Sequence, residues 1–252
     1  MQRTLNGPVP DRIARLPKDH RGYPVPFFVE WAGGKPLFPV MDPDKMKACM
    51  RRSLCWICGE PLGAYKAFAI GPMCTVNRIS AEPPQHVDCA KFATANCPFM
   101  TQPLAKRTPM DKFGPVQKPG GVMIERNPGV TAIWVTKSYT VIRDAGKPLW
   151  RLGPATTLQF WARGRHATRS EVDHSIGTGL PILRKHAALE GPEAIRELER
   201  QLATTAEMLA NFVTWPPVEP ENSAELGRNP SAETSQENLP DVDLSSFAEH
   251  VP

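Results

Sequence analysis

Long apolar runs are absent from this chain of 252 residues. A helix needs ~18 consecutive apolar residues to cross the apolar layer of a bilayer, and no such stretch occurs. The beginning of the chain, Met1 to Pro8, also lacks the apolar run of a secretory signal. We therefore expect a protein without a membrane span that is located in the cytoplasm.

Signature motifs of several enzyme classes are also missing. The sequence has no Gly-x-x-x-x-Gly-Lys-Ser/Thr phosphate loop, no Gly-x-Ser-x-Gly elbow, and no His-x-Glu followed by Pro-Cys-x-x-Cys as in zinc deaminases. Histidines at His20, His166, His174 and His186 neighbour Arg or Asp or lie on expected helix faces, where solvated or hydrogen-bonded imidazoles are common. No enzyme class is indicated by these residues.

Cysteine and proline, in contrast, carry information. The 28 prolines, about twice the usual ~5%, predict short elements joined by ordered turns. Five of the six cysteines fall between Cys55 and Cys97. Their Cys-x-x-Cys and His-x-x-Cys spacings favour metal binding over disulfides in a reducing compartment. The hydrophobic content of 41% allows a buried core.

Charge is distributed unevenly along the chain. Residues 216–252 carry eight acidic residues and one arginine, which leaves 29 basic and 18 acidic residues in positions 1–215. A basic body of this kind attracts nucleic acid or an acidic protein, although the same surplus also serves solubility alone. The acidic tail is rich in Ser, Asn, Pro and Glu, a composition that predicts disorder.

The strongest motif is a candidate zinc site. Cys55 and Cys58, followed by Gly59, have the spacing of a zinc knuckle, in which two thiolates lie on one tight turn. His86 and Cys89 lie three residues apart near the start of an expected helix, so they share a face, and the helix N-terminus favours a thiolate. Four protein ligands complete a tetrahedral site without an open position, so we predict one structural Zn²⁺.

Three other cysteines lie within or near the motif. Cys74 could replace His86 as the fourth ligand if the register of its segment differs. Cys49 lies on the helix expected after Asp42-Pro43 and is a core residue or, alternatively, a ligand. Cys97 lies eleven residues beyond His86, roughly 16 Å along an ideal helix, which is too far for the same ion.

The segment between the two ligand pairs is expected to form a β-hairpin. Tyr65 to Ile70 and Met73 to Ile79 have strand composition, and Gly71-Pro72 lies between them as a turn. Knuckle, hairpin and ligand-bearing helix follow each other in the order of a treble-clef zinc finger, which the region 54–100 resembles. The hairpin contains no His that could act as a general base, which argues against a histidine–metal nuclease.

The flanking segments predict further strands and helices. Residues 23–40 are expected to form an irregular hairpin that turns at Gly33-Gly34, followed by a helix that begins at Asp42-Pro43. In the second half we expect an antiparallel meander (129–136, 139–143 and 149–152) and then a short helix (154–163). The next helix begins with a Thr168–Glu171 capping box and is expected to kink or break near Gly177, Gly179 and Pro181. A last helix begins at Pro192, and its apolar stripe consists of Ile195, Leu198, Leu202, Leu209 and Phe212.

Together these elements indicate an α+β protein with a treble-clef-like zinc module, a β-meander with packed helices and a disordered acidic tail. The expected divisions are an N-terminal arm (1–20), a hairpin and treble-clef zinc module (21–102), a basic Pro-rich connector (103–128), a β-meander with helices (129–215) and the tail (216–252).

Basic residues near the zinc motif form a candidate nucleic-acid-binding surface, namely Arg51, Arg52, Lys66, Arg78 and Lys91. The alternative is that they are the solvated face of a packing module. We therefore predict a zinc-stabilised binding protein that engages nucleic acid or an acidic host or phage protein. The alternative function is an enzyme, a hydrolase or nuclease, with a site in the cleft between the two halves.

Five short strings carry a resemblance that goes beyond single motifs. They are Cys55-Trp56-Ile57-Cys58-Gly59, Ile70-Gly71-Pro72-Met73-Cys74, Glu82-Pro83-Pro84, His86-x-x-Cys89-Ala90 and Cys97-Pro98-Phe99. This set resembles a family of uncharacterised bacterial and phage proteins, with a likeness from about Arg21 to Pro192. The resemblance implies a zinc module and a cytoplasmic or phage setting, and it implies no activity.

Overall fold

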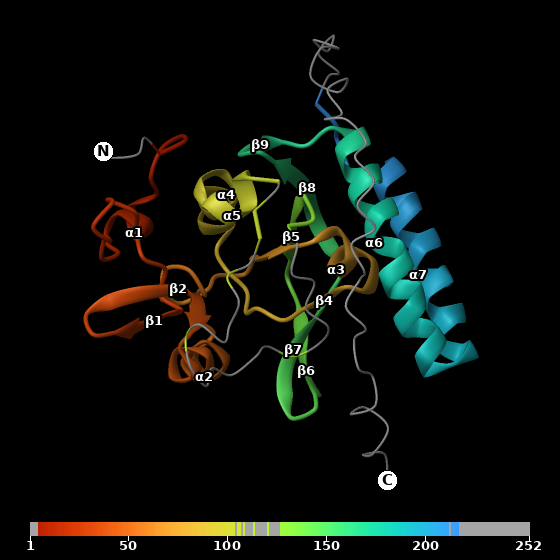
Figure 1. Ribbon diagram of the computed structural model, residues 1–252, viewed down its shortest axis with the longest axis horizontal. Coiled ribbons are helices and arrows are strands. Elements are labelled where there is room, and N and C mark those ends of the chain that lie inside the picture. The colour runs from red at the N-terminus through yellow and green to blue at the C-terminus, as the bar shows by residue number, and fades with distance from the viewer. Residues whose placement is uncertain are drawn as a thin grey trace, which may run out of the picture. The chain divides into compact units, whose positions relative to one another are not determined.

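The computed structural model describes residues 5–103, 105, 106, 108, 113, 120, 127–211 and 213–216, which belong to one unit spanning Met1–Pro216. Most of the predicted basic connector, and all of the predicted acidic tail after Pro216, lie outside the described residues. The described chain combines helices with antiparallel sheets, which confirms the α+β class (Figure 1).

Helices and strands alternate irregularly along the chain. The helices are α1 (Asp11–Ala14), α2 (Pro43–Arg52), α3 (Pro72–Asn77), α4 (Val87–Asn96), α5 (Pro98–Thr101), α6 (Arg169–Glu190) and α7 (Pro192–Asn211). The strands are β1 (Val29–Ala32), β2 (Lys35–Met41), β3 (Lys66–Ile70), β4 (Ile79–Ser80), β5 (Thr131–Thr136), β6 (Tyr139–Asp144), β7 (Lys147–Leu152), β8 (Ala155–Ala162) and β9 (Arg165–His166).

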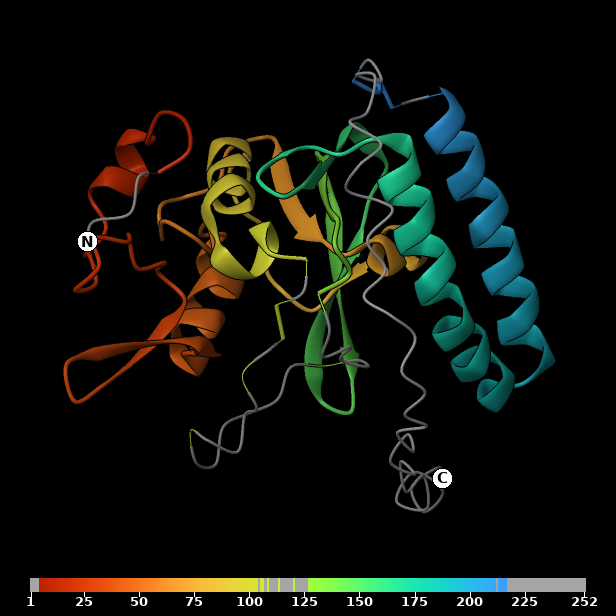
Figure 2. The ribbon, with the colours of Figure 1, turned by 45° about the horizontal axis from the view of Figure 1, so that its top comes forward.

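The strands form three antiparallel sheets in the described residues. β1 and β2 make a hairpin, β3, β5, β8 and β9 make the central sheet in that order, and β4, β7 and β6 make the third. α4 lies on one face of the central sheet, and the α6–α7 pair lies on the other side, as both views show (Figures 1 and 2). Because side chains alternate along a strand, adjacent residues of β5 point to opposite faces of the sheet, one toward α4 and the next toward the α6–α7 side.

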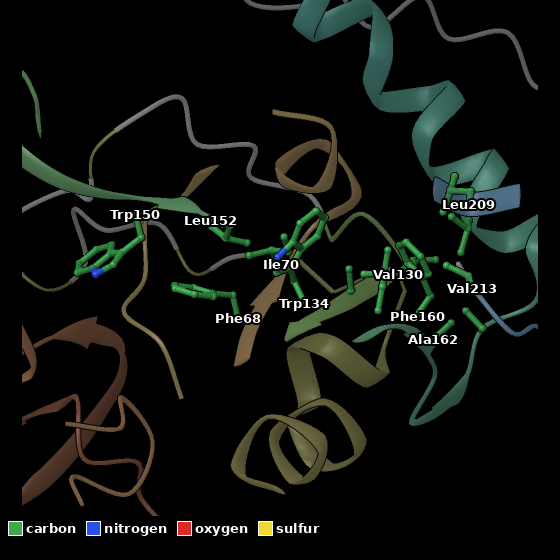
Figure 3. Packing of buried hydrophobic residues seen from close by; sticks show 14 residues of the cluster. Phe68, Ile70, Val130, Trp134, Trp150, Leu152, Phe160, Ala162, Leu209 and Val213 are labelled. Atoms are coloured by element: carbon green, nitrogen blue, oxygen red, sulfur yellow. The ribbon is translucent and has the colours of Figure 1, made fainter. Parts of the chain in front are cut away.

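The largest core fills the α6–α7 side of the central sheet (Figure 3). Trp134 of β5 lies opposite Phe68 of β3 and Leu158 of β8, and it is almost fully buried. Its indole Nε1 donates a hydrogen bond of 3.0 Å to the carbonyl oxygen of Gly153, which satisfies the polar atom of this buried ring. Ile133 and Val135, the neighbours of Trp134, instead join Ala67 and Ala90 in a smaller cluster under α4.

Several local predictions are confirmed. Asp42 caps α2, because its carboxylate accepts hydrogen bonds from the backbone N–H groups of Asp44 and Lys45. Thr168 and Glu171 form the predicted capping box at the start of α6. The β1–β2 hairpin turns at two glycines with φ of +54° and +72°, Gly33 and Gly34, as a two-residue turn of this hand requires.

The predicted hairpin between the ligand pairs is wrong in its second strand. The segment expected as a strand, 73–79, forms helix α3 and only two residues of strand, β4. Pro72 is the first residue of this helix, and Gly71 is its cap, so Gly-Pro starts a helix here instead of turning a hairpin. β3 pairs with β5, whose residues lie 62 to 70 positions further along the chain.

The segment 154–163, predicted as a short helix, is a strand, β8. Its buried residues are Leu158, Phe160 and Ala162, which alternate as the inner face of a strand requires. The helix prediction placed Leu158 and Trp161 on one face. In the strand they lie on opposite faces of the sheet, with Leu158 in the large core and Trp161 against the cluster under α4. Arg163 and Gly164, both with positive φ, form the turn into β9.

The predicted three-stranded meander is divided between two sheets. β6 and β7 form the expected hairpin, which turns at Ala145 and Gly146 with φ of +45° and +78°. β5 does not pair with β6, and it lies between β3 and β8 in the central sheet. Spacing along the chain predicted the strands but not their partners, because pairing depends on contacts between distant segments.

The predicted break in the helix after Thr168 does not occur, since α6 continues through Gly177, Gly179 and Pro181. α7 begins at Pro192 as predicted, and Leu198 and Leu209 of its stripe are buried, whereas Ile195 is exposed and Phe212 lies outside the described residues. None of the described helices has the length and apolarity needed to cross a membrane.

Residues 5–20 of the predicted N-terminal arm pack against α4 and the small core beside it. α1 buries Ile13 completely. Asn6 donates a hydrogen bond from its side chain to the carbonyl oxygen of Ala95 and exchanges further hydrogen bonds with Asn96, at the end of α4. The arm therefore contributes to the packing around this helix.

The two glycines of α6 provide a matched pair for testing its packing. A Cβ on Gly179 would lie 2.7 Å from Sδ of Met73 in α3, whereas a Cβ on Gly177 meets nothing within 4 Å. We expect Gly177→Ala to raise the free energy of unfolding by ~0.5–1 kcal/mol, as alanine favours a helix over glycine. Gly179→Ala is expected to lower it, because overpacking costs ~1–3 kcal/mol. Urea denaturation measures the free energy of unfolding of both variants. Equal changes in Gly177→Ala and Gly179→Ala would contradict the close α3–α6 packing.

Candidate metal centre

The Cys55–Cys58 pair lies on a tight turn. Leu54 and Pro61 pair as an isolated antiparallel bridge, and the backbone N–H of Cys55 donates to the carbonyl oxygen of Glu60 at 2.7 Å. The N–H of Gly59 closes the turn on the carbonyl oxygen of Cys55 at 2.8 Å. Gly59 has φ of +76°, a conformation that suits glycine because it lacks a Cβ.

The second ligand pair lies at the start of α4. As predicted, His86 and Cys89 lie near a helix start, because α4 begins at Val87. His86 is therefore the cap residue, with extended backbone, and Cys89 is in the first turn. The N–H of Trp56 donates to the carbonyl oxygen of Pro84 at 3.1 Å, which ties the turn to the segment that precedes α4.

These two segments bring four donor atoms together. The three Sγ atoms of Cys55, Cys58 and Cys89 and a ring nitrogen of His86 all lie within 4.8 Å of one another. Nδ1 of His86 lies 3.4 Å from Sγ of Cys58 and 3.9 Å from Sγ of Cys89. Donors of a tetrahedral zinc ion lie ~3.5–3.8 Å apart for bonds of the usual length. The cluster could therefore hold a metal ion such as zinc.

The orientation of the His86 ring supports this use of Nδ1. Its other nitrogen, Nε2, lies 3.0 Å from the carbonyl oxygen of Pro61. A carbonyl oxygen only accepts, so this contact places the ring proton on Nε2 and leaves the Nδ1 lone pair directed at the thiols. Metal-binding histidines commonly have their second nitrogen held in this way.

Backbone N–H groups also face the sulfur of Cys55. The N–H groups of Cys58 and His86 lie 3.5 Å and 3.4 Å from this Sγ. Burial raises the pKa of the Cys55 thiol, but hydrogen bonds from the other cysteines and from these N–H groups outweigh burial and lower the pKa. Hydrogen bonds to Cys55 and Cys58, together with burial, raise the pKa of Cys89 above its usual range. A bound cation would stabilise all three thiolates together.

A small apolar core encloses the cluster. Cys55 and Cys89 are fully buried, and they pack with Ile13 of α1 and with Trp56, whose ring stacks on Phe28 at a centroid distance of 4.8 Å. This core shields the sulfurs of Cys55 and Cys89 from water, whereas Cys58 and His86 are half-buried and lie at its edge.

Two arginines of the arm lie at the edge of this core. Arg12 forms an ion pair of 3.2 Å with Asp88, the neighbour of Cys89, and Arg15 pairs with Glu60 of the tight turn. Burial lowers the pKa of Arg12, but attraction to Asp88 and then to Cys89 raises it by more than burial lowers it. The pKa of Arg12 therefore lies above its ordinary value. The arm thus contacts both segments that carry the donors.

The other candidate cysteines lie in separate packing environments. Cys49 is buried in the small core, where burial and the nearby Cys55 raise the pKa of its thiol to about 12. Cys74 lies on α3 and packs against the large core. The donor cluster of the described residues contains neither of them and includes His86.

The predicted basic surface is not a single patch. Arg51, Arg52 and Lys91 are exposed, at the end of α2 and on α4. Lys66 donates hydrogen bonds to the carbonyl oxygens of Ala64 and Lys137. Arg78 places its guanidinium over the ring of Trp134, and this ring faces away from the side of the sheet that α4 covers. The structure therefore separates Arg78 from Lys91.

Arg78 instead lines a cavity that no sequence motif indicated. The cavity has a volume of about 400 Å³ and lies between β4, β7 and α7. Residues from both halves of the chain contribute to it, and its polar lining includes Asn77, Arg78, Arg151, Glu197, Arg200 and Thr204. The sequence contains no signal for this cavity, because its three arginines come from three separate segments of the chain.

Comparison with protein families, with curated proteins and with solved structures gives no match for this chain. The resemblance drawn from the motif strings therefore stays a prediction. A function can be proposed only from the chemistry of the residues themselves.

The turn glycine provides a test of the knuckle geometry. A Cβ on Gly59 would lie 2.7 Å from Cδ2 of Phe27, and its φ is unfavourable for alanine. We expect Gly59→Ala to lower the free energy of unfolding by ~1–3 kcal/mol and to weaken metal binding, because the turn must open. Gly63→Ala, where a Cβ meets nothing within 4 Å, should change stability by less than ~0.5 kcal/mol. Thermal unfolding measures the change in stability, and a competitive metal titration measures the change in metal affinity. Equal changes in Gly59→Ala and Gly63→Ala would refute this account of the turn.

Proposed function

We propose that this chain is a zinc-stabilised binding protein in which Cys55, Cys58, His86 and Cys89 hold one structural Zn²⁺. The observation that carries the proposal is the convergence of three thiols and one imidazole nitrogen within 4.8 Å, at the edge of an apolar core that buries two of the thiols. Soft thiolates with one imidazole favour zinc over magnesium or calcium, which prefer oxygen ligands. A site with four protein ligands leaves no position for substrate or water, so the ion stabilises the fold.

The proposed module is of treble-clef type. A tight turn supplies the first two ligands and the start of a helix supplies the last two, which is the arrangement of that module. The module departs from the expected pattern between these parts, where β3, α3 and β4 replace a simple hairpin. A phage or prophage setting follows from the motif resemblance alone.

The proposed partner is nucleic acid, engaged through the exposed residues Arg51, Arg52 and Lys91. None of these side chains forms an ion pair with a carboxylate of the described segments, so their charges are available to a polyanion. An acidic host or phage protein would be recognised by the same charges.

Metal content tests the zinc proposal. We expect one zinc per chain by elemental analysis, and loss of zinc together with native structure in Cys55→Ser, because one thiolate is removed from a closed site. Cys49→Ala and Cys74→Ala are the matched controls and should keep the zinc. His86→Ala should lose it, whereas His86→Cys should retain it, since four thiolates also form a standard zinc site. Two zinc ions, no zinc, or zinc retained in Cys55→Ser would refute the single site.

Salt-dependent binding tests the partner. The zinc-loaded chain is expected to bind single- or double-stranded nucleic acid with an affinity that falls steeply with salt. Changing Arg51, Arg52 or Lys91 to Glu should weaken binding and reduce the slope of log K against log salt by about 1 for each phosphate that is no longer neutralised. Lys35→Glu, at the exposed β1–β2 turn, is the control and should change neither the affinity nor the slope of its salt dependence. Absence of binding at low salt would exclude nucleic acid and leave the acidic protein as the partner to test.

A further inference from the structure

Two neighbouring cavities lie beside α7 on the side of the central sheet that α4 does not cover. The first, of about 400 Å³, is the arginine-lined cavity described above. The second, of about 350 Å³, is lined by Trp134, Pro154 and Met208, and both cavities share Arg78 and Thr204. Because they share these two residues the cavities adjoin, and we refer to the pair as the groove; each is within the size range of small-ligand sites.

The first cavity has a surplus of positive charge. Three guanidinium groups, of Arg78, Arg151 and Arg200, line it together with one carboxylate, Glu197. Glu197 is already engaged, because it accepts hydrogen bonds from Arg200 at 2.6 Å and 2.9 Å and from Gln201 at 2.7 Å. Arg200 and Gln201, and to a smaller extent Arg151, lower the pKa of Glu197, although neither Arg78 nor Arg151 forms an ion pair among the residues that the structure describes. Arg151 is exposed and Arg78 is half-buried, so water solvates them when no ligand is bound, and a phosphate would replace that water.

Arg78 and Arg151 are placed next to each other by the backbone. β4 and β7 pair so that Ile79, the neighbour of Arg78, lies opposite Arg151, and the N–H of Leu152 donates to the carbonyl oxygen of Arg78 at 2.8 Å. Arg78 has φ of +57°, which is uncommon for a residue with a side chain. Its guanidinium lies 5.8 Å from the ring centre of Trp134, where the two cavities meet. Arg78 therefore lines both cavities.

The second cavity has a different chemistry. Its walls are mainly apolar, with Pro154, Ala155 and Met208 beside the ring of Trp134. It also contains the carboxylate of Glu207, which would repel a phosphate but accepts hydrogen bonds from hydroxyl or amino groups. The groove thus combines an anion-binding end with an apolar end that carries one acceptor.

We propose that this groove binds a nucleotide, with the phosphate at Arg78, Arg151 and Arg200 and the base against Pro154, Ala155 and Met208. Arginine forks match phosphate oxygens, and guanidinium planes and apolar surfaces accept the faces of bases. Glu207 accepts from a sugar hydroxyl or a base amino group. The nucleotide is a free mononucleotide or the end of a strand, and the groove is separate from the metal centre and from the Arg51, Arg52 and Lys91 surface.

Titration calorimetry of the full-length, zinc-loaded chain with adenosine 5′-monophosphate tests the site. We expect saturable binding that Arg151→Gln weakens about tenfold or more, since one charged hydrogen-bonding group is removed. Arg143→Gln is the matched control, because Arg143 is an exposed arginine on β6 of the same sheet and does not line the groove. Met208→Ala should weaken the nucleotide but leave the binding of inorganic phosphate unchanged. No saturable binding, or equal effects of Arg151→Gln and Arg143→Gln, would overturn the proposal.

Two oligonucleotides distinguish the sources of the nucleotide. An oligothymidylate with a 5′-phosphate that displaces adenosine 5′-monophosphate, while the same strand without that phosphate does not, would identify a strand end. Displacement by neither strand, with nucleotide binding intact, would identify the free mononucleotide. Equal displacement by both strands, insensitive to Arg151→Gln, would contradict a phosphate site in the groove. Arg151→Gln should keep one zinc per chain and the salt-dependent binding, so failure here is separable from failure of the zinc or partner proposal.

Discussion

The convergence of four donor side chains on one point constrains the first half of this protein more than any other interaction. It joins the turn that carries Cys55 and Cys58 to the start of α4, which carries His86 and Cys89. α1 adds to this junction through Ile13, which packs into the same small core, and through ion pairs to both segments. α4 in turn packs on β3 and β5, so the position of the donor cluster is coupled to the central sheet.

The central sheet separates two sets of chemistry. Ile133 and Val135 of β5 face α4, which carries one of the candidate donors, whereas Trp134 between them faces the large core and the guanidinium of Arg78. This alternation follows from the pleat of a strand. It places the candidate metal centre and the proposed nucleotide groove on opposite sides of the sheet, so that a bound metal ion would affect the groove only through the stability of the fold.

The parts of the structure that were predicted correctly depend on residues a few positions apart. Asp42 with Pro43, and Thr168 with Glu171, set helix starts through hydrogen bonds within one turn. The errors arose where a short pattern is compatible with two elements. Gly71-Pro72 suits both a turn and a helix start, and the segment 155–162 contains apolar residues at both helical and strand spacing. The partner strand decided the second case, because β8 completes the sheet beside β5.

The sequence by itself determined the donor types and their pairwise spacing, because Cys-x-x-Cys and His-x-x-Cys each lie within one local turn. It did not determine that the two pairs meet, that the second nitrogen of His86 faces the carbonyl oxygen of Pro61, or that Arg78, Arg151 and Arg200 share one cavity. These arrangements join segments that lie tens to more than a hundred residues apart, so they depend on the tertiary fold. Local hydrogen bonding specifies the first kind of feature, and burial of side chains between distant segments decides the second.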